Sequence, residues 1–294
     1  MIFKPPGLIV GGGQAFDLSS PRNLHTMTHG NKGMTLLELA IGILLTGIVL
    51  SAAFSLYITQ QKQLIIQDEI TDVQSNIRAA TAELATQIRL AGFELPEGLQ
   101  AIQAYNTNPD TIILTYASPD FSQVKTEHQM PDPYSVLQCD GHDLSNLRDN
   151  EWVYIADPIL GMGEYFLATA VDYSSSSIQH GTMALSHSYP PDSRILKIMQ
   201  FKYYVDMSDS SHPNLMRQVN NEAPQVFAEN ITDMQFRYSL SSLNVVDVPI
   251  IDNMIREVLI SVAARTDKPD QDFQNQYRRR TLTTSVKVRN LGIN

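Results

Sequence analysis

The chain has 294 residues with 21 basic and 31 acidic side chains, a net charge of −10, so one large domain or two small ones are expected. This charge argues against general nucleic-acid binding, which needs a basic face. Cys139 is the single cysteine, which excludes an intrachain disulfide and leaves stability to the packed core.

Residues 1–33 contain no apolar run long enough for a secretory signal. Pro, Gly and polar residues dominate this segment, a composition that predicts disorder. Met27 begins the short basic stretch MTHGNKG, so one interpretation is a translation start at Met27, with residues 1–26 as an extension. A long leader beginning at Met1 is the other.

The segment Gly33 to Ile58 reads G-MTLLELAIGILLTGIVLSAAFSLYI, and Glu38 is its one charged residue. Roughly 20 apolar residues suffice to cross a bilayer as a helix, so residues 34–58 are predicted to span a membrane. A charge inside such a helix is costly and usually has a partner. Without a partner, Glu38 would have to extend towards the membrane surface.

The helix is predicted to continue through residues 59–92, because Thr59 to Ala91 contains neither Pro nor Gly. Gly92 and Pro96 then supply stop signals. Apolar residues recur at steps of three and four, which indicates one amphipathic face. They are Ile66, Ile70, Val73, Ile77, Ala80, Leu84, Ile88 and Ala91.

Charges flanking the apolar segment predict its orientation. Lys32 precedes it, and Asp68, Glu69 and Asp72 follow it. The positive-inside bias places the N-terminus in the cytoplasm and the remainder outside.

Residues 93–294 are predicted to form a mainly antiparallel β domain, because β-branched and aromatic runs alternate with turn signals. A helix followed by such strands is an α+β arrangement. Polar loops are expected at residues 206–214 and 267–275. Strands are expected at Thr111–Tyr116, Trp152–Ala156, Tyr165–Val171, Ile195–Val205, Leu215–Val219, Met234–Leu240, Arg256–Arg265 and Leu282–Val288.

The basic leader, Gly33, Met34, the TLLEL run and the apolar segment together resemble the processing site of type IV prepilins. The resemblance implies that a membrane prepilin peptidase cuts after Gly33 and methylates the new amine of Met34. It also implies that Glu38 offsets this amine and sets subunit register during assembly, since either charge alone would be expensive in low dielectric.

Later blocks extend the resemblance to PilW-type minor pilins: RLAGFELPEG, QVFAENITDMQFRYSL, IREVLISVAART and YRRRTLTTSVKVRNLG. The resemblance implies a minor pilin of the bacterial inner membrane and then the pilus, possessing a pilin-like α+β fold. Its implied partners are the prepilin peptidase and methylase, other major and minor pilins, the inner-membrane assembly platform and membrane lipid. The alternatives are a J-class type II secretion pseudopilin and a simple membrane-anchored periplasmic binding or adhesion domain.

Other motifs predict no catalytic residue, metal site or cofactor. Cys139-Asp140-Gly141-His142-Asp143 matches no zinc spacing and is predicted to be a polar turn with a buried or idle thiol. Surface positions are expected for His128, His180, His187 and His212, and no Ser-His-Asp arrangement stands out. Solvated loops are favoured over calcium ligands for Asp247, Asp252, Asp267, Asp270 and Asp272. Arg278–Arg280 is expected to guard a strand edge or form salt bridges.

Overall fold

The computed structural model describes residues 33–121 and 123–292, which form two compact units divided between Ile58 and Thr59. The expected leader before Gly33, with its two candidate start sites, lies outside the described residues. The elements are α1 (Leu36–Leu90), β1 (Ile102–Tyr105), β2 (Thr111–Ala117), the 3-10 helix η1 (Pro119–Phe121), β3 (Leu137–Gln138), β4 (Glu151–Ala156), β5 (Gly163–Ala168), β6 (Ala170–Asp172), β7 (Ser177–Gln179), β8 (Arg194–Leu196), β9 (Ile198–Asp206), β10 (Asn214–Val219), β11 (Gln225–Glu229), β12 (Ile231–Leu240), β13 (Val245–Val246), the 3-10 helix η2 (Asp252–Met254), β14 (Ile255–Arg265) and β15 (Arg279–Lys287).

The first unit contains the N-terminal part of α1, in which every side chain is exposed. Its most apolar window has a mean hydropathy of 2.3, and none of that window is buried. By length and composition, α1 is therefore able to cross a membrane. The helix continues without interruption through Gly42 and Gly47, so neither glycine unwinds it.

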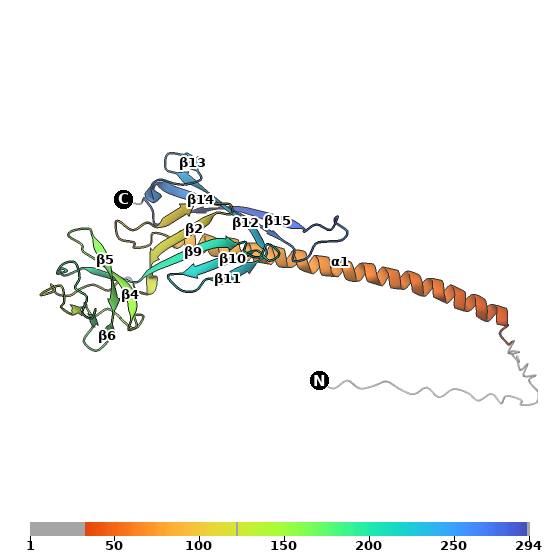
Figure 1. Ribbon diagram of the computed structural model, residues 1–294, viewed down its shortest axis with the longest axis horizontal. Coiled ribbons are helices and arrows are strands. Elements are labelled where there is room, and N and C mark those ends of the chain that lie inside the picture. The colour runs from red at the N-terminus through yellow and green to blue at the C-terminus, as the bar shows by residue number, and fades with distance from the viewer. Residues whose placement is uncertain (1–32, 122, 293–294) are drawn as a thin grey trace, which may run out of the picture. The chain divides into compact units, whose positions relative to one another are not determined.

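The second unit combines the rest of α1 with antiparallel sheets, which confirms the predicted order of a long apolar helix followed by antiparallel strands (Figure 1). One sheet has the order β1-β2-β9-β10-β11 and another has the order β13-β12-β14-β15. The predicted apolar stripe of the helix contributes Val73, Ile77, Leu84 and Ile88 to the main core, where they pack with residues of both sheets. The apolar face of this part of the helix thus packs into the main core.

A second core lies within the segment 118–197, which connects β2 to β9 although these two strands pair directly. This insertion contains the small sheets β5-β4-β8 and β3-β7-β6. Its core includes Leu147, Ile155, Phe166 and Tyr189, all of them buried. The segment therefore packs around its own apolar centre, while its two ends connect to the paired strands β2 and β9.

The predicted strands are present, but two of them are divided. Thr169 separates β5 from β6 because its amide N–H donates to Gln179 at 2.8 Å, which directs the chain into the other small sheet. Lys197 likewise separates β8 from β9, at the point where the chain leaves the insertion. Strands β1, β3, β7, β11 and β13 were not predicted, because their short segments lack a clear apolar alternation.

The helix ends at Leu90, followed by Gly92 at a φ of +79°. A left-handed residue after the last turn is the common way to end a helix, and glycine adopts it without steric cost. The side-chain amide of Asn290 then donates to the carbonyl of Arg89 at 3.0 Å. A residue near the C-terminus thus satisfies a carbonyl that the helix leaves unpaired.

A polar network joins α1 to the sheet inside the main core. The hydroxyl of buried Tyr203 donates to Glu83 at 2.7 Å, and Arg217 donates to the same oxygen at 3.4 Å. Tyr116 donates to Gln87 at 2.8 Å one turn further along the helix. Burial and the neighbouring Glu83 carboxylate raise the pKa of Tyr203 far above 10, so the hydroxyl keeps its proton and remains a donor.

Candidate functional site

Glu38 makes a local contact at the start of α1. Its carboxylate accepts hydrogen bonds from the backbone N–H of Thr35 at 3.1 Å and from the Thr35 hydroxyl at 3.2 Å. The Glu38 N–H in turn donates to the Thr35 hydroxyl at 3.2 Å. This reciprocal pattern is a capping box, with Thr35 at the N-cap and Glu38 three residues later.

The capping box was missed by our sequence analysis, although its signal is visible there as the motif Thr-Leu-Leu-Glu. In the uncut chain, Glu38 is therefore paired with Thr35 at the N-terminus of its own helix. Met34 and Glu38 line the same face of this segment.

A shallow groove of about 380 Å³ follows one face of this part of the helix. Its lining repeats at steps of about four residues and includes Met34, Glu38, Gly42 and Gly47. Both glycines have open space where a Cβ would be. Small residues allow helix backbones to approach closely, so this face can accept another helix.

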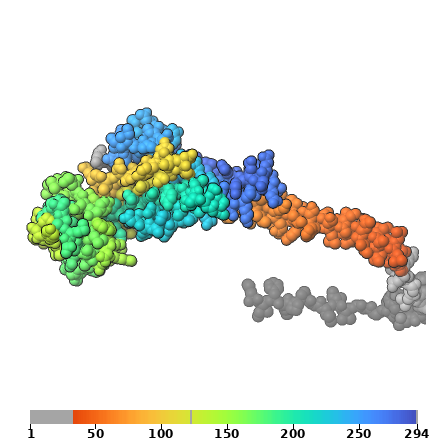
Figure 2. Space-filling model, in the orientation of Figure 1, coloured from red at the N-terminus to blue at the C-terminus, as the bar shows by residue number. Residues whose placement is uncertain are grey.

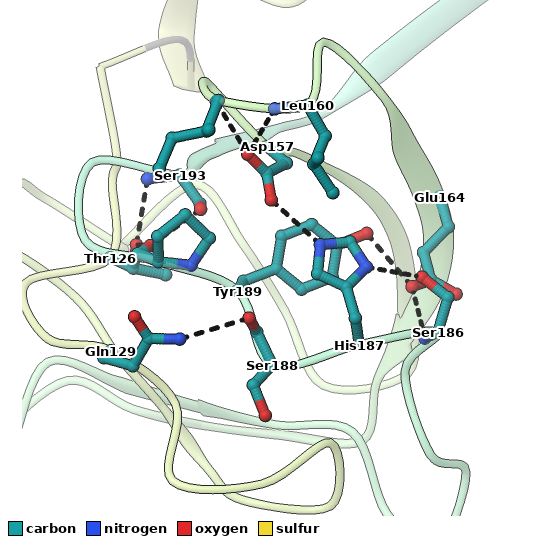
Figure 3. A network of polar contacts seen from close by, with 12 residues as sticks. Thr126, Gln129, Asp157, Leu160, Glu164, Ser186, His187, Ser188, Tyr189 and Ser193 are labelled. Carbon is teal, nitrogen blue, oxygen red and sulfur yellow. Dashed lines mark hydrogen bonds and ion pairs between the residues drawn. The ribbon is translucent and has the colours of Figure 1, made fainter.

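The second unit contains a Ser–His–Asp contact that the sequence did not predict. Figure 3 shows His187 between Ser186 and Asp157, with its Nε2 2.9 Å from Asp157 and its Nδ1 2.9 Å from the Ser186 hydroxyl. An ionised carboxylate has no proton to donate, so Nε2 carries the hydrogen of the contact with Asp157. The His187 ring packs against Tyr189 with a centroid distance of 4.2 Å.

The surroundings of Ser186 favour a structural role for this contact. Activated serines work beside free N–H donors that bind the developing oxyanion. The Ser186 N–H instead donates to the Glu164 carboxylate at 2.6 Å, which places a negative charge where an oxyanion would form. Asp157 also accepts from the N–H groups of Ile159 and Leu160, closing the turn between β4 and β5.

Two expectations about histidines are corrected. His180 is buried, not exposed: its ring nitrogens lie 2.7 Å and 2.9 Å from the carbonyls of Met183 and Ser135. His187 is partly buried by the contacts described above. The Met183 carbonyl is only three residues away, but the Ser135 carbonyl comes from a distant loop, so no local sequence pattern predicts this burial.

The expectation of a buried or idle thiol is confirmed for Cys139. Burial, assisted by the charge of Asp140, raises the pKa of the thiol to about 12. The thiolate is the nucleophile and the metal ligand, so this cysteine is unreactive near neutral pH. The following residues form the expected polar turn, with Gly141 at a φ of +83°.

Arg278 and Asp270 pair at 2.6 Å. Arg279 and Arg280 begin β15, an outer strand of its sheet. The arginine run therefore forms a salt bridge through Arg278 and also lies on a sheet edge. Within residues 33–121 and 123–292, no three His, Cys, Asp or Glu side chains group closely enough to hold a metal ion.

Comparisons with known proteins identify no relative: no family model, no curated protein and no solved structure matches this chain.

Proposed function

We propose that this chain is a minor pilin of the PilW type that takes part in the assembly or initiation of a type IV pilus. A prepilin peptidase cuts it after Gly33 and methylates Met34. The chain first crosses the bacterial inner membrane, with its N-terminus in the cytoplasm and its β domain in the periplasm. It then enters the filament together with other pilins.

The observation that carries this proposal is the arrangement at the start of α1. A helix begins two residues after the Gly33–Met34 bond, its apolar side chains up to Ile58 are exposed, and a carboxylate lies in its first turn. Exposed apolar surface of this extent calls for lipid or for other apolar helices. A filament subunit uses both environments in turn, so moving between them costs little net transfer free energy.

The helix face with Gly42 and Gly47 supports the second environment. Close approach at the two glycines would bring a neighbouring helix against an apolar wall. Glu38 would then lie near the methylated amine of its own chain or of a neighbour. Pairing these charges in low dielectric favours one register over its alternatives.

The proposal is tested by mass spectrometry of the N-terminal peptide from native membranes, in cells with and without the prepilin peptidase. We expect a peptide that begins at N-methylated Met34 in the first case and an uncut leader in the second. An uncut leader in both would contradict the proposal and favour a simple anchored binding domain.

Subunits of type IV pili and of type II secretion pseudopili share this processing, so the proteins that copurify with the chain distinguish the two assemblies. Copurification with pilins agrees with the proposal. Copurification with secretion-system pseudopilins would instead identify a J-class pseudopilin of type II secretion.

A further inference from the structure

The largest of the grooves described here lies in the second unit, where the insertion meets the sheet that contains β9. It has a volume of about 740 Å³. One wall holds Trp152 and Tyr165, and the opposite wall holds Gln200, Asn220, Asn221 and Glu222. Figure 2 shows the green and cyan segments that contribute these walls meeting at the surface. Ligand sites commonly have volumes of about 300–1,000 Å³ and lie between packed units of structure.

The aromatic wall is fixed by strand register. Trp152 pairs with Leu167 and Tyr154 pairs with Tyr165 across β4 and β5, so Trp152 and Tyr165 share one face of this sheet. Tyr154 is buried and contacts Tyr165 edge-on with ring centroids 4.9 Å apart, so the Tyr165 ring packs against a buried neighbour. Trp152 is 55% exposed, an unusual position for the largest apolar side chain.

The opposite wall offers hydrogen-bonding groups. Within the described residues, the side-chain amides of Gln200 and Asn221 make no hydrogen bond with the protein, and neither does the Glu222 carboxylate. The same holds for the amide of Asn150 at the groove's end. Each amide offers two donors and an acceptor, so the wall can bind a ligand with many polar groups.

The backbone holds part of this wall in place. The N–H of Gln200 donates to the Asn220 side chain at 2.8 Å, and the N–H of Asn220 donates back to the Gln200 carbonyl at 2.8 Å. This reciprocal pair fixes the turn after β10. The neighbouring amides are therefore displayed from a defined turn, which lowers the ordering cost of binding.

The charges in the groove favour a neutral ligand. Lys197 binds the Glu151 carboxylate at 2.9 Å and 3.0 Å, which neutralises both groups. Glu222 then remains as an unpaired acid, on a chain with a net charge of −10. An anionic ligand would meet repulsion here.

We propose that this groove binds a neutral saccharide, with a sugar ring stacked on Trp152 and its hydroxyls bound by the amide wall. A pyranose has an apolar face of C–H groups, which suits the negative face of an indole. Its edge carries hydroxyls that donate and accept, which suits amides and carboxylates. A proline-rich peptide also binds aromatic grooves, but it offers few donors to a wall with several unpaired acceptors.

The test uses the full chain in detergent micelles and an array of neutral and sialylated oligosaccharides, which includes maltotriose, chitotriose and lactose. Trp152 is the chain's only tryptophan, so its fluorescence reports on this groove alone. We expect a saturable change of fluorescence with one or more neutral sugars and weaker binding by the sialylated ones.

Calorimetric titration of variants with the best sugar then locates the site. We expect Trp152→Ala to weaken binding at least about tenfold, Trp152→Phe to restore part of it, and Asn221→Ala to weaken it. Tyr134→Ala, which removes an exposed tyrosine elsewhere, should leave affinity unchanged. Circular dichroism confirms that each variant is folded.

Three results would overturn the inference: no neutral member of the array binds, binding survives Trp152→Ala, or a proline-rich peptide binds in place of sugars. The inference is independent of the pilin proposal, because an anchored domain with an uncut leader would bind the same sugar.

Discussion

Glu38 has one observed role and one proposed role, and substitutions can separate them. Its carboxylate completes the capping box with Thr35, and we propose that it also pairs with the amine that processing would create. Glutamine keeps the cap, because an amide oxygen also accepts from Thr35, but it removes the charge. Comparing Glu38→Gln with Glu38→Ala therefore distinguishes a helix cap from a charge partner.

We predict that Glu38→Ala and Glu38→Gln both leave the chain inserted and cleaved but reduce its incorporation into filaments several-fold. The charge is then the property that matters. The amount of the chain in sheared filaments, relative to membranes, measures this, and Asp68→Ala serves as a control on an exposed part of the same helix. Normal incorporation of Glu38→Gln would reduce Glu38 to a helix cap.

Glu83 is the centre of the helix-to-sheet network, and its removal leaves the buried Tyr203 hydroxyl without an acceptor. We predict that Glu83→Ala lowers the free energy of unfolding by about 1–3 kcal/mol, the usual cost of an unsatisfied buried group. Glu83→Gln retains an acceptor and should lose less. Denaturant unfolding measures both, and exposed Asp72→Ala is the control. An equal loss in all three variants would contradict this role.

Asp157 and Asp270 make stability depend on pH. Burial raises the pKa of Asp157, but hydrogen bonds from Leu160, His187 and Ile159 together bring it below its usual 3.8. Asp270 behaves alike: burial raises its pKa, but the hydrogen bond and charge of Arg278, together with the N–H groups of Asp272 and Phe273, bring it below its usual value. A lowered folded-state pKa stabilises the protein above the unfolded-state pKa, and this stabilisation is lost as pH falls through the folded-state value.

We therefore predict that the melting temperature falls as the pH drops below about 4. Asp157→Asn should be less stable than the parent at pH 6 and should approach it as the pH falls through the folded-state pKa of Asp157. Thermal unfolding across this range measures the difference. A constant difference between the two proteins at all pH values would contradict the assignment.

At the scale of elements, the end of α1 depends on the backbone at Gly92. A Cβ there would lie 2.7 Å from Leu291 and 3.3 Å from Ala101, in addition to the strain of a φ of +79°. Gly98 has a φ of +88° but open space around its Cβ position. An alanine would therefore be strained by the backbone at both positions, but only at position 92 would its Cβ also meet close neighbours.

We predict that Gly98→Ala costs about 1–2 kcal/mol from the left-handed backbone alone. Gly92→Ala should cost more, because the C-terminal segment must move away from the helix end. Denaturant unfolding measures both. Equal losses of unfolding free energy would show that Leu291 moves away from the new Cβ at no measurable cost.

At the scale of the molecule, the boundary between Ile58 and Thr59 separates two kinds of surface. The apolar side chains before it are exposed, whereas the second unit has its own buried core. We predict that a chain beginning at Thr59 is soluble without detergent and unfolds cooperatively. Size-exclusion chromatography and thermal unfolding test this, and aggregation would show that the first unit is needed for folding.

The sequence by itself determined the long helix, its apolar half and its amphipathic half. These features depend on composition and on a period of 3.6 residues, both local properties. It also located most strands and both polar loops, through β-branched runs and turn residues. The capping box at Thr35 and Glu38 was equally local, and the motif alone would have sufficed to find it.

Only the tertiary structure decided where distant segments meet. It placed the 118–197 insertion between two directly paired strands, buried His180 between two carbonyls, and brought Ser186, His187 and Asp157 together. It also set Trp152 opposite the turn after β10. Each of these arrangements includes a contact between residues tens of positions apart, such as His180 with Ser135 and His187 with Asp157. One sequence carries no periodic signal for such pairs, because chain reversal and packing select them.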